Sequence, residues 1–311
     1  MSGFFSLLER DALLHITGPD ALKFLQGQTT CDTRKIEATQ ASPGAYCTPQ
    51  GRVVCDFLLS QLGEAHFALR LRRDIRDSSA AVFGKYIVFS KAELDSARDD
   101  WAIVACWGED ARAALADIFD KTPSTRYAAV SKPGAVLVQL DEQGEAFECY
   151  IDNNHNADLL ERIAQNLDSA PENEWETQQI RNGIARIEAA TAGEFIPQML
   201  NYDLTGHVSF NKGCYTGQEV VARMHYRGKS KRRMYLGQLP AAAEPGAPLY
   251  VAGQEQSAGN IVNCAAHSGG ISALLVATDN GVATGLHLQQ TDDGPAIAIG
   301  TLPYAVAASE D

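Results

Sequence analysis

The sequence lacks the signatures of several protein classes. Its seven cysteines form no Cys-x-x-Cys pair in 311 residues, which predicts reduced thiols rather than a disulfide framework or a structural zinc site. No apolar run approaches the ~20 residues that a membrane-spanning helix needs. No Gly-x-Gly-x-x-Gly follows an expected strand, so nothing supports a dinucleotide-binding fold. We therefore expect a protein with no membrane partner and no bound metal.

Positive charge is also scarce. The chain has 26 lysines and arginines against 39 aspartates and glutamates, for a formal net charge of -13. Such a surface repels a polyanion, so we do not expect nucleic acid as a partner. The N-terminal stretch is short and turns acidic too early for a secretory signal. The expected location is the cytoplasm, or a matrix if a transit peptide has been removed.

Apolar segments with strand and helix periodicity alternate up to residue 167, which predicts an α+β fold. From Met234 onward, short apolar runs are divided by Gly and Pro turns, which predicts a small β-barrel or sandwich. We expect a domain boundary near Lys231, with an α+β region at 1–230 and the β-module at 231–311. The expected strands lie at 12–17, 44–48, 52–61, 65–71, 85–94, 101–106, 135–140 and 147–151, and the expected helices at 20–27, 72–84, 109–119, 157–167, 175–182 and 216–226.

The most distinctive stretch reads KGCYTGQE and runs from Lys212 to Glu219. Two glycines four residues apart bracket Cys214, and glycine lets the backbone approach a neighbour where a Cβ atom would clash. A cysteine is a nucleophile or metal ligand only as the thiolate, which a nearby cation such as Lys212 favours. The alternative interpretation is that Cys214 is a small buried hydrophobe in a loop.

A basic segment follows this thiol. Six of the 26 lysines and arginines fall within residues 223–233 of an otherwise acidic chain. This concentration predicts a site for an anionic ligand or partner. The alternative is a solvated helix end whose cations face the helix macrodipole. The six are Arg223, Arg227, Lys229, Lys231, Arg232 and Arg233.

Two acids lie inside apolar segments. Asp56 alternates with aliphatic neighbours in the strand expected at 52–61, and Glu188 ends a short apolar run. A buried carboxylate needs a partner or a shifted pKa, so both are candidate site residues. The alternative for Asp56 is a solvent-facing position on a half-exposed strand.

The residues from Phe210 to Arg223 closely resemble the signature of the YgfZ family. These folate-binding proteins are similar to the aminomethyltransferase, or T-protein, of the glycine cleavage system. The eight residues of KGCYTGQE match the family pattern without a gap. The resemblance extends to the N-terminal, hairpin and pteridine-binding motifs, at 18–30, 49–56, 186–189 and 195–198.

This resemblance implies a fold of two interleaved α+β subdomains that form a central channel, plus a small C-terminal β-barrel. It implies that tetrahydrofolate or a folate derivative binds in the channel. In the family, the lysine and cysteine that match Lys212 and Cys214 form the functional pair. The expected folate contacts are Asp56, Glu188, Tyr215, Arg223 and Arg227, with the acids at the pteridine and the arginines at the glutamate tail.

Two functions remain open at this point, and a third, RNA binding through the basic segment, is opposed by the global charge and by the few interleaved aromatics, Tyr215, Tyr226 and Tyr235. The resemblance implies a tetrahydrofolate-binding factor that assembles or repairs iron–sulfur clusters, with client enzymes or assembly proteins as partners. Near such a ligand Cys214 could ligate iron transiently, relay a thiol exchange or attack a one-carbon adduct. The alternative is a tetrahydrofolate-dependent aminomethyl or one-carbon transferase, or a demethylase, with Asp56 near the reactive edge of the folate. The T-protein tends to have paired acids at the hairpin site, whereas Cys55 precedes Asp56 here.

Overall fold

The structure is a computed structural model that describes residues 2–156, 158–228, 230–290 and 294–306. The chain divides into two compact units, each assembled from segments that are distant in sequence. Unit 1 contains residues 1–45, 55–172 and 211–215, and unit 2 contains residues 46–54, 173–210 and 216–311. Within the described ranges, none of the helices combines the length and the apolar character that crossing a membrane requires.

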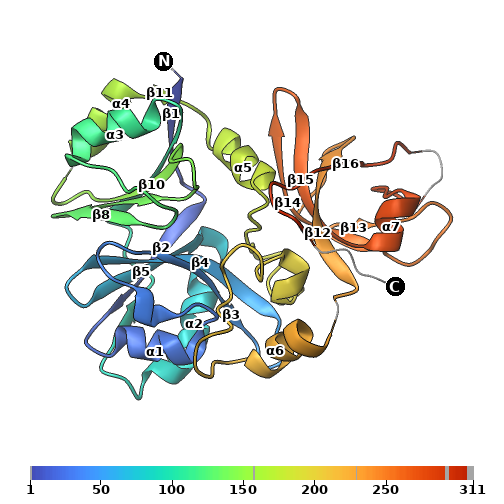
Figure 1. Cartoon of the computed structure of the whole chain (residues 1–311), viewed down its shortest axis with the longest axis horizontal. Helices are drawn as coiled ribbons and strands as arrows, with labels where there is room; N and C mark the ends of the chain where they lie inside the picture. The colour runs from blue at the N-terminus through green and yellow to red at the C-terminus, as the bar shows by residue number, and fades with distance from the viewer. Residues whose placement is uncertain (1, 157, 229, 291–293, 307–311) are drawn as a thin grey trace. The chain divides into compact units, whose positions relative to one another are not determined.

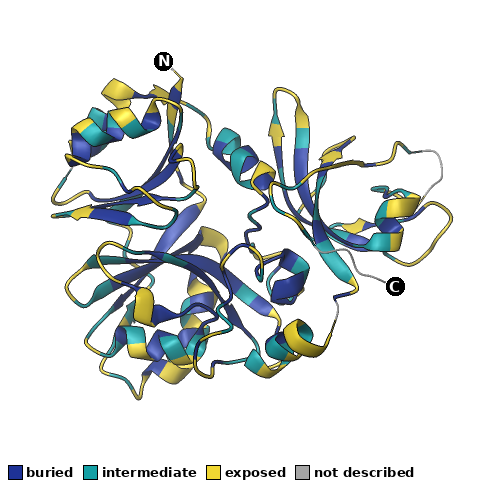
Figure 2. Ribbon diagram, viewed as in Figure 1, coloured by how far each residue is buried: buried dark blue, intermediate teal, exposed yellow. Residues whose placement is uncertain are grey.

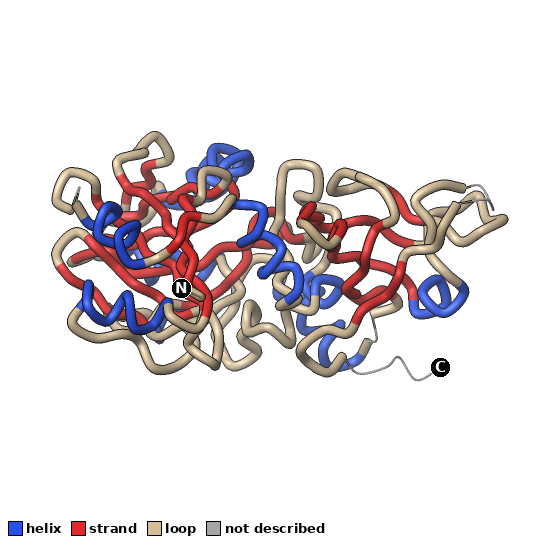
Figure 3. The backbone as a smooth tube through the Cα atoms, turned by 90° about the horizontal axis from the view of Figure 1, so that it is seen from above, coloured by secondary structure: helices blue, strands red, loops and turns tan. Residues whose placement is uncertain are grey.

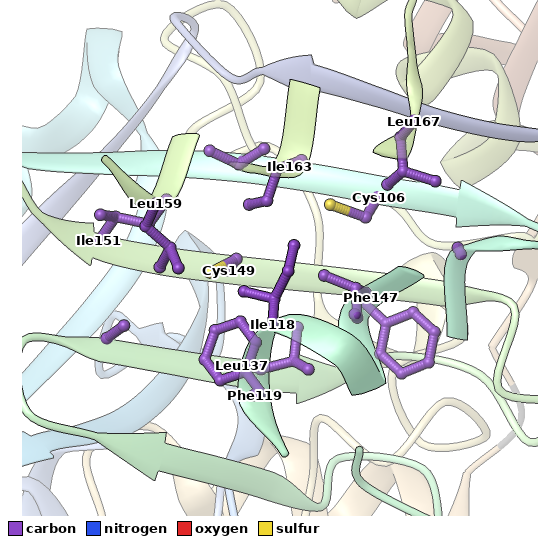
Figure 4. Packing of buried hydrophobic residues seen from close by; sticks show 14 of the residues in the cluster. Cys106, Ile118, Phe119, Leu137, Phe147, Cys149, Ile151, Leu159, Ile163 and Leu167 are labelled. Atoms are coloured by element: carbon purple, nitrogen blue, oxygen red, sulfur yellow. The ribbon is translucent and has the colours of Figure 1, made fainter. Parts of the chain in front are cut away.

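The first sheet of unit 1 has six strands in the order β11-β1-β7-β10-β9-β8. Helices α3 (Ala111–Phe119) and α4 (Leu159–Asn166) contact each other and bury their apolar sides against this sheet (Figures 1 and 4). Leu137 and Phe147 of the sheet lie in the same cluster as Ile163 of α4. The strands are β1 (Gly3–Leu7), β7 (Trp101–Gly108), β8 (Ala129–Lys132), β9 (Ala135–Gln139), β10 (Ala146–Asp152) and β11 (Asp168–Ser169).

The second sheet has five strands in the order β3-β4-β5-β2-β6. It is accompanied by α1 (Ala21–Gln28), the 3-10 turns η1 (Thr33–Lys35) and η2 (Arg73–Ile75), and α2 (Arg76–Ile87). Figure 2 shows that its central strands are buried. The strands are β2 (Asp11–Thr17), β3 (Ser42–Cys47), β4 (Val53–Gly63), β5 (His66–Arg72) and β6 (Glu93–Asp95).

Unit 2 contains the third sheet, with strands in the order β13-β14-β15-β12-β16. Helices α5 (Glu172–Arg181) and α6 (Gln218–Arg227) precede the sheet in sequence, and the long segment between them contains η3 (Pro197–Leu200). Figure 3 shows this unit's strands in red and its connecting loops in tan. The remaining elements are β12 (Arg232–Leu239), β13 (Pro248–Leu249), β14 (Gly259–His267), β15 (Gly270–Thr278), α7 (Asp279–Thr284) and β16 (Ala298–Gly300).

Most expected elements are present, and the mixed α+β class is confirmed. The strand expected at 85–94 is wrong, because α2 continues to Ile87 and only Glu93–Asp95 pairs with a neighbour. The helix expected at 157–167 begins at Leu159, and Ala157 lies outside the described residues. The domain boundary near Lys231 stays a prediction.

Candidate functional site

Lys212 connects the KGCYTGQE stretch to a distant part of the chain. Its ammonium group donates three hydrogen bonds to backbone carbonyls, at 2.8 Å to Gln26, 2.5 Å to Thr29 and 2.8 Å to Cys31. The side chain crosses to a segment more than 180 positions away in sequence, and it is only 8% exposed. We call residues 26–31 together with Lys212 the lysine clamp.

The end of α1 explains why one of the three carbonyls, that of Gln26, is available, while Thr29 and Cys31 follow the helix. The helix ends at Gln28, and the last carbonyls of any α-helix have no partner within the helix. The carbonyl of Gln26 belongs to the last turn, at the negative end of the helix dipole, where a cation is stabilised. Arg34 adds a second connection by donating to the carbonyl of Asn211 at 3.4 Å. The thiol loop is therefore anchored to the end of α1.

The three carbonyl acceptors require the protonated form of Lys212. Burial lowers the pKa of this ammonium to about 8. A neutral amine has two N–H groups and could not satisfy three acceptors, so the clamp requires the protonated form. The ammonium also lies 5.0 Å from the ring centre of Tyr215, a cation–π contact that helps to hold the buried tyrosine.

Cys214 is exposed, which favours the reactive-thiol interpretation over the core-filler alternative. Five of the other cysteines are buried, and Cys264 is intermediate. Cys264 donates to the carbonyl of Ala243 at 3.0 Å, and burial raises the pKa of its thiol to about 11. The hydrogen bonds of Lys212 go to the clamp carbonyls, so this side chain connects the loop that contains the exposed thiol to residues 26–31.

The two glycines of the stretch differ in their surroundings. Gly217 has φ +82°, and a Cβ atom there would lie 2.4 Å from the carbonyl oxygen of Thr48. No heavy atom lies within 4 Å of a Cβ built on Gly213. The expected close approach of backbone therefore applies to Gly217, which precedes α6, and not to Gly213.

Asp56 lies in β4 and is 1% exposed. The sequence placed it among aliphatic neighbours, and Cys55 and Phe57 beside it are equally buried. The solvent-facing alternative for Asp56 is therefore wrong. A carboxylate in such surroundings is a candidate for a functional role.

Glu188 is held by a residue that the sequence analysis missed. The side chain of Asn263 donates to Glu188 Oε1 at 2.9 Å and to the carbonyl of Arg186 at 2.8 Å. Its amide oxygen accepts from the backbone N–H of Arg186 at 2.8 Å. The pairing of β14 with β15 shifts between Ile261 and Asn263, and such a β-bulge re-aims side chains. The sequence did not predict Asn263 as a site residue, because it lies in a β-strand with no recognisable motif around it.

Some cations of the basic segment bind groups of their own chain, and others are exposed to solvent. Arg233 pairs with Asp203 at 2.8 Å, and Arg232 donates to the carbonyl of Ser257. Arg223 and Arg227 lie on α6 and are exposed. The predicted Lys229 lies outside the described residues.

The predicted site residues thus belong to both units. Unit 1 contains Asp56, Lys212, Cys214 and Tyr215, whereas unit 2 contains Glu188 and the two arginines of α6. The structure joins Lys212 directly to Tyr215 through the cation–π contact. Within the described ranges, no three histidine, cysteine or acidic side chains gather as metal ligands would.

Known proteins resemble this chain in sequence and in fold. The model of the GCVT N-terminal domain matches residues 12–168. The tRNA-modifying protein YgfZ of Serratia proteamaculans is 32% identical over 306 residues, which cover 96% of this chain and 92% of that protein. The protein of the same name from Yersinia pseudotuberculosis is 32% identical over 302 residues, which cover 95% and 91%.

Among solved structures, the glycine cleavage system aminomethyltransferase T of Bartonella henselae is similar, with a TM-score of 0.77. The match covers 97% of this chain and 86% of that one. Because the identity is 16%, this similarity establishes the fold and not the activity.

Proposed function

This chain belongs to the YgfZ family, and on that premise we propose that it is a tetrahydrofolate-binding factor that assembles or repairs iron–sulfur clusters in client enzymes. The observation that carries the proposal is the exposed Cys214 on a loop anchored by the lysine clamp. A thiol that exchanges with a partner must be both accessible and held in place. Cys214 meets the first condition by its exposure and the second through Lys212.

The proposed ligand is tetrahydrofolate, which accepts a one-carbon unit at its reactive edge, or a folate derivative that carries one. The acids proposed for the pteridine are Asp56 and Glu188, because a carboxylate accepts several hydrogen bonds from amino and ring N–H groups. Asn263 fixes one oxygen of Glu188 and so orients that carboxylate. Arg223 and Arg227 are proposed for the tail, since the guanidinium fork matches a carboxylate. Tyr215 is proposed as a further contact.

The finer architecture is part of the same proposal. We propose two interleaved α+β subdomains around a central folate channel, with residues 231–311 as a small β-barrel. The similarity to aminomethyltransferase T supports the fold at the level of the whole chain. The five-stranded C-terminal sheet supports the barrel-like module.

The client proteins are proposed to include an enzyme that modifies tRNA. The name of the relatives, tRNA-modifying protein, supports this proposal together with the proposed role in cluster maintenance. In that case the protein acts on the enzyme and not on the tRNA base. The cytoplasm is the proposed location.

The alternative is a tetrahydrofolate-dependent one-carbon transferase, and the buried Asp56 is the observation that favours it. A carboxylate screened from water can stabilise charge or move a proton at the reacting edge of the folate. Incubation with aminomethyl or N-methyl donors tests this role. Formation of methylene-tetrahydrofolate that is lost in Asp56→Asn supports the transferase, and no product from any donor excludes it.

Binding of tetrahydrofolate by the purified protein tests the ligand assignment. We expect saturable binding in titration calorimetry that Glu188→Gln weakens about 10- to 100-fold, because a charge-assisted hydrogen bond contributes about 1.5–3 kcal/mol. Glu161→Gln, on the unit 1 helix α4, is the control and should bind as the unchanged protein does. Absence of saturable binding would overturn the folate proposal.

A further inference from the structure

Helix α6 and the segments on either side of it combine exposed cations with a cluster of aromatic rings. Arg223, Arg227 and Lys231 are exposed, and none makes a hydrogen bond or ion pair to another residue in the described ranges. Figure 2 shows the exposed character of this helix. Cations that neutralise no acid of their own chain are available to an anionic partner.

Three rings lie on the same part of unit 2. The ring of Phe210 stacks on that of His225, with centroids 3.6 Å apart and planes at 13°. Tyr226 meets both rings edge-on, at 6.2 Å from Phe210 and 4.8 Å from His225. The side chain of Tyr226 is 67% exposed. The sequence did not reveal this cluster, because Phe210 precedes α6 and is separated from His225 along the chain.

We propose that this surface, which consists of Phe210, Arg223, His225, Tyr226, Arg227 and Lys231, binds a single-stranded nucleic acid. Aromatic faces receive unpaired bases, and the cations contact the phosphates between them. An acidic protein partner would use the cations but would leave an exposed tyrosine face without a stacking ligand. The strongly acidic remainder of the chain limits attraction of a polyanion to this surface.

The inference goes beyond the folate proposal and shares only Arg223 and Arg227 with it. Phe210, His225, Tyr226 and Lys231 have no proposed contact with folate. Variants at these four positions therefore separate the two proposals. These variants should lose nucleic-acid binding and keep folate binding. An unchanged protein that binds folate but no nucleic acid overturns this proposal alone, and one that binds nucleic acid but no folate overturns the folate proposal alone.

Fluorescence anisotropy with a labelled 12-nucleotide single strand tests the site. The logarithm of the binding constant should fall with the logarithm of salt concentration with a slope of about -2, from three cations at about 0.7 each. Tyr226→Ala should weaken binding about 5- to 150-fold, as expected for the loss of one stacked base. Tyr86→Ala, at an exposed tyrosine of α2, should bind normally.

A second set of anisotropy measurements distinguishes RNA from DNA as the natural ligand. RNA and DNA of the same sequence are compared, and tighter binding of one of them assigns the natural ligand. A duplex of that sequence should bind more weakly, because its base faces are already stacked. Equal affinity of duplex and single strand, no effect of Tyr226→Ala, or no binding at 50 mM salt would overturn the proposal. Circular dichroism of each variant confirms that it is folded.

Discussion

Replacement of Lys212 by methionine should loosen the thiol loop without removing the thiol. The change keeps the length and most of the volume of the side chain but deletes all three N–H donors. The carbonyls of Gln26, Thr29 and Cys31 then lose their partner, and two of these contacts are fully buried. A buried acceptor without a partner is costly, so the stability of this region should fall.

The magnitude follows from two opposing terms. Three hydrogen bonds from a charged donor contribute about 5–9 kcal/mol in total at about 1.5–3 kcal/mol each. Burial of the ammonium, which lowers its pKa from 10.5 to about 8, opposes this by at most about 3 kcal/mol before solvent screening is considered. The net loss of unfolding free energy in Lys212→Met is therefore about 2–6 kcal/mol.

Urea unfolding and hydrogen exchange measured by mass spectrometry check this value. Exchange should accelerate in peptides that cover residues 21–36 and 211–215, while peptides of β14 and β15 should stay protected. Lys23→Met is the matched control, because Lys23 is an exposed lysine on α1, the helix whose end Lys212 contacts. An unfolding free energy and an exchange pattern for Lys212→Met that equal those of the control would refute the lysine clamp.

Three further changes have defined outcomes. Burial lowers the pKa of His15 from 6.5 to about 4, so the contribution of His15 to the unfolding free energy should be constant above pH 6.5 and fall by up to about 3 kcal/mol (at about 1.4 kcal/mol for each pH unit between 6.5 and 4) as the pH approaches 4. His15→Gln should flatten this dependence in urea titrations and exposed His155→Gln should not; equal slopes would contradict the assignment. Asn263→Ala should cost about 2–4 kcal/mol through three lost hydrogen bonds and weaken tetrahydrofolate binding, and unchanged calorimetric affinity would separate it from the site. Gly217→Ala should lower the melting temperature because of its positive φ and the nearby carbonyl, whereas Gly213→Ala should be neutral; the reverse order would disprove the packing argument.

The sequence predicted most secondary structure because periodicity reports which side of an element is buried. The exception near Val88 and Phe89 is instructive. Their β-branched and aromatic character is typical of a strand, yet they are 70% and 92% exposed and follow the end of α2. Strand propensity reflects packing against neighbours, which these two side chains lack in the folded unit.

The contacts of the candidate site were less predictable. The motif identified Lys212 and Cys214, but the acceptors of Lys212 are backbone carbonyls, which no residue type reveals. Asn263 reaches its partners because β14 contains a bulge, and no local pattern marks that register shift. Long-range contacts of this kind depend on tertiary structure.

The activity of iron–sulfur client enzymes in cells that carry only the Cys214→Ala variant tests the central claim most directly. The account predicts low client activity, while the purified variant folds and binds tetrahydrofolate normally because the lysine clamp is intact. Cys264→Ala, at the other cysteine that is not fully buried, should leave client activity unchanged. Normal client activity in the Cys214→Ala cells would contradict the account.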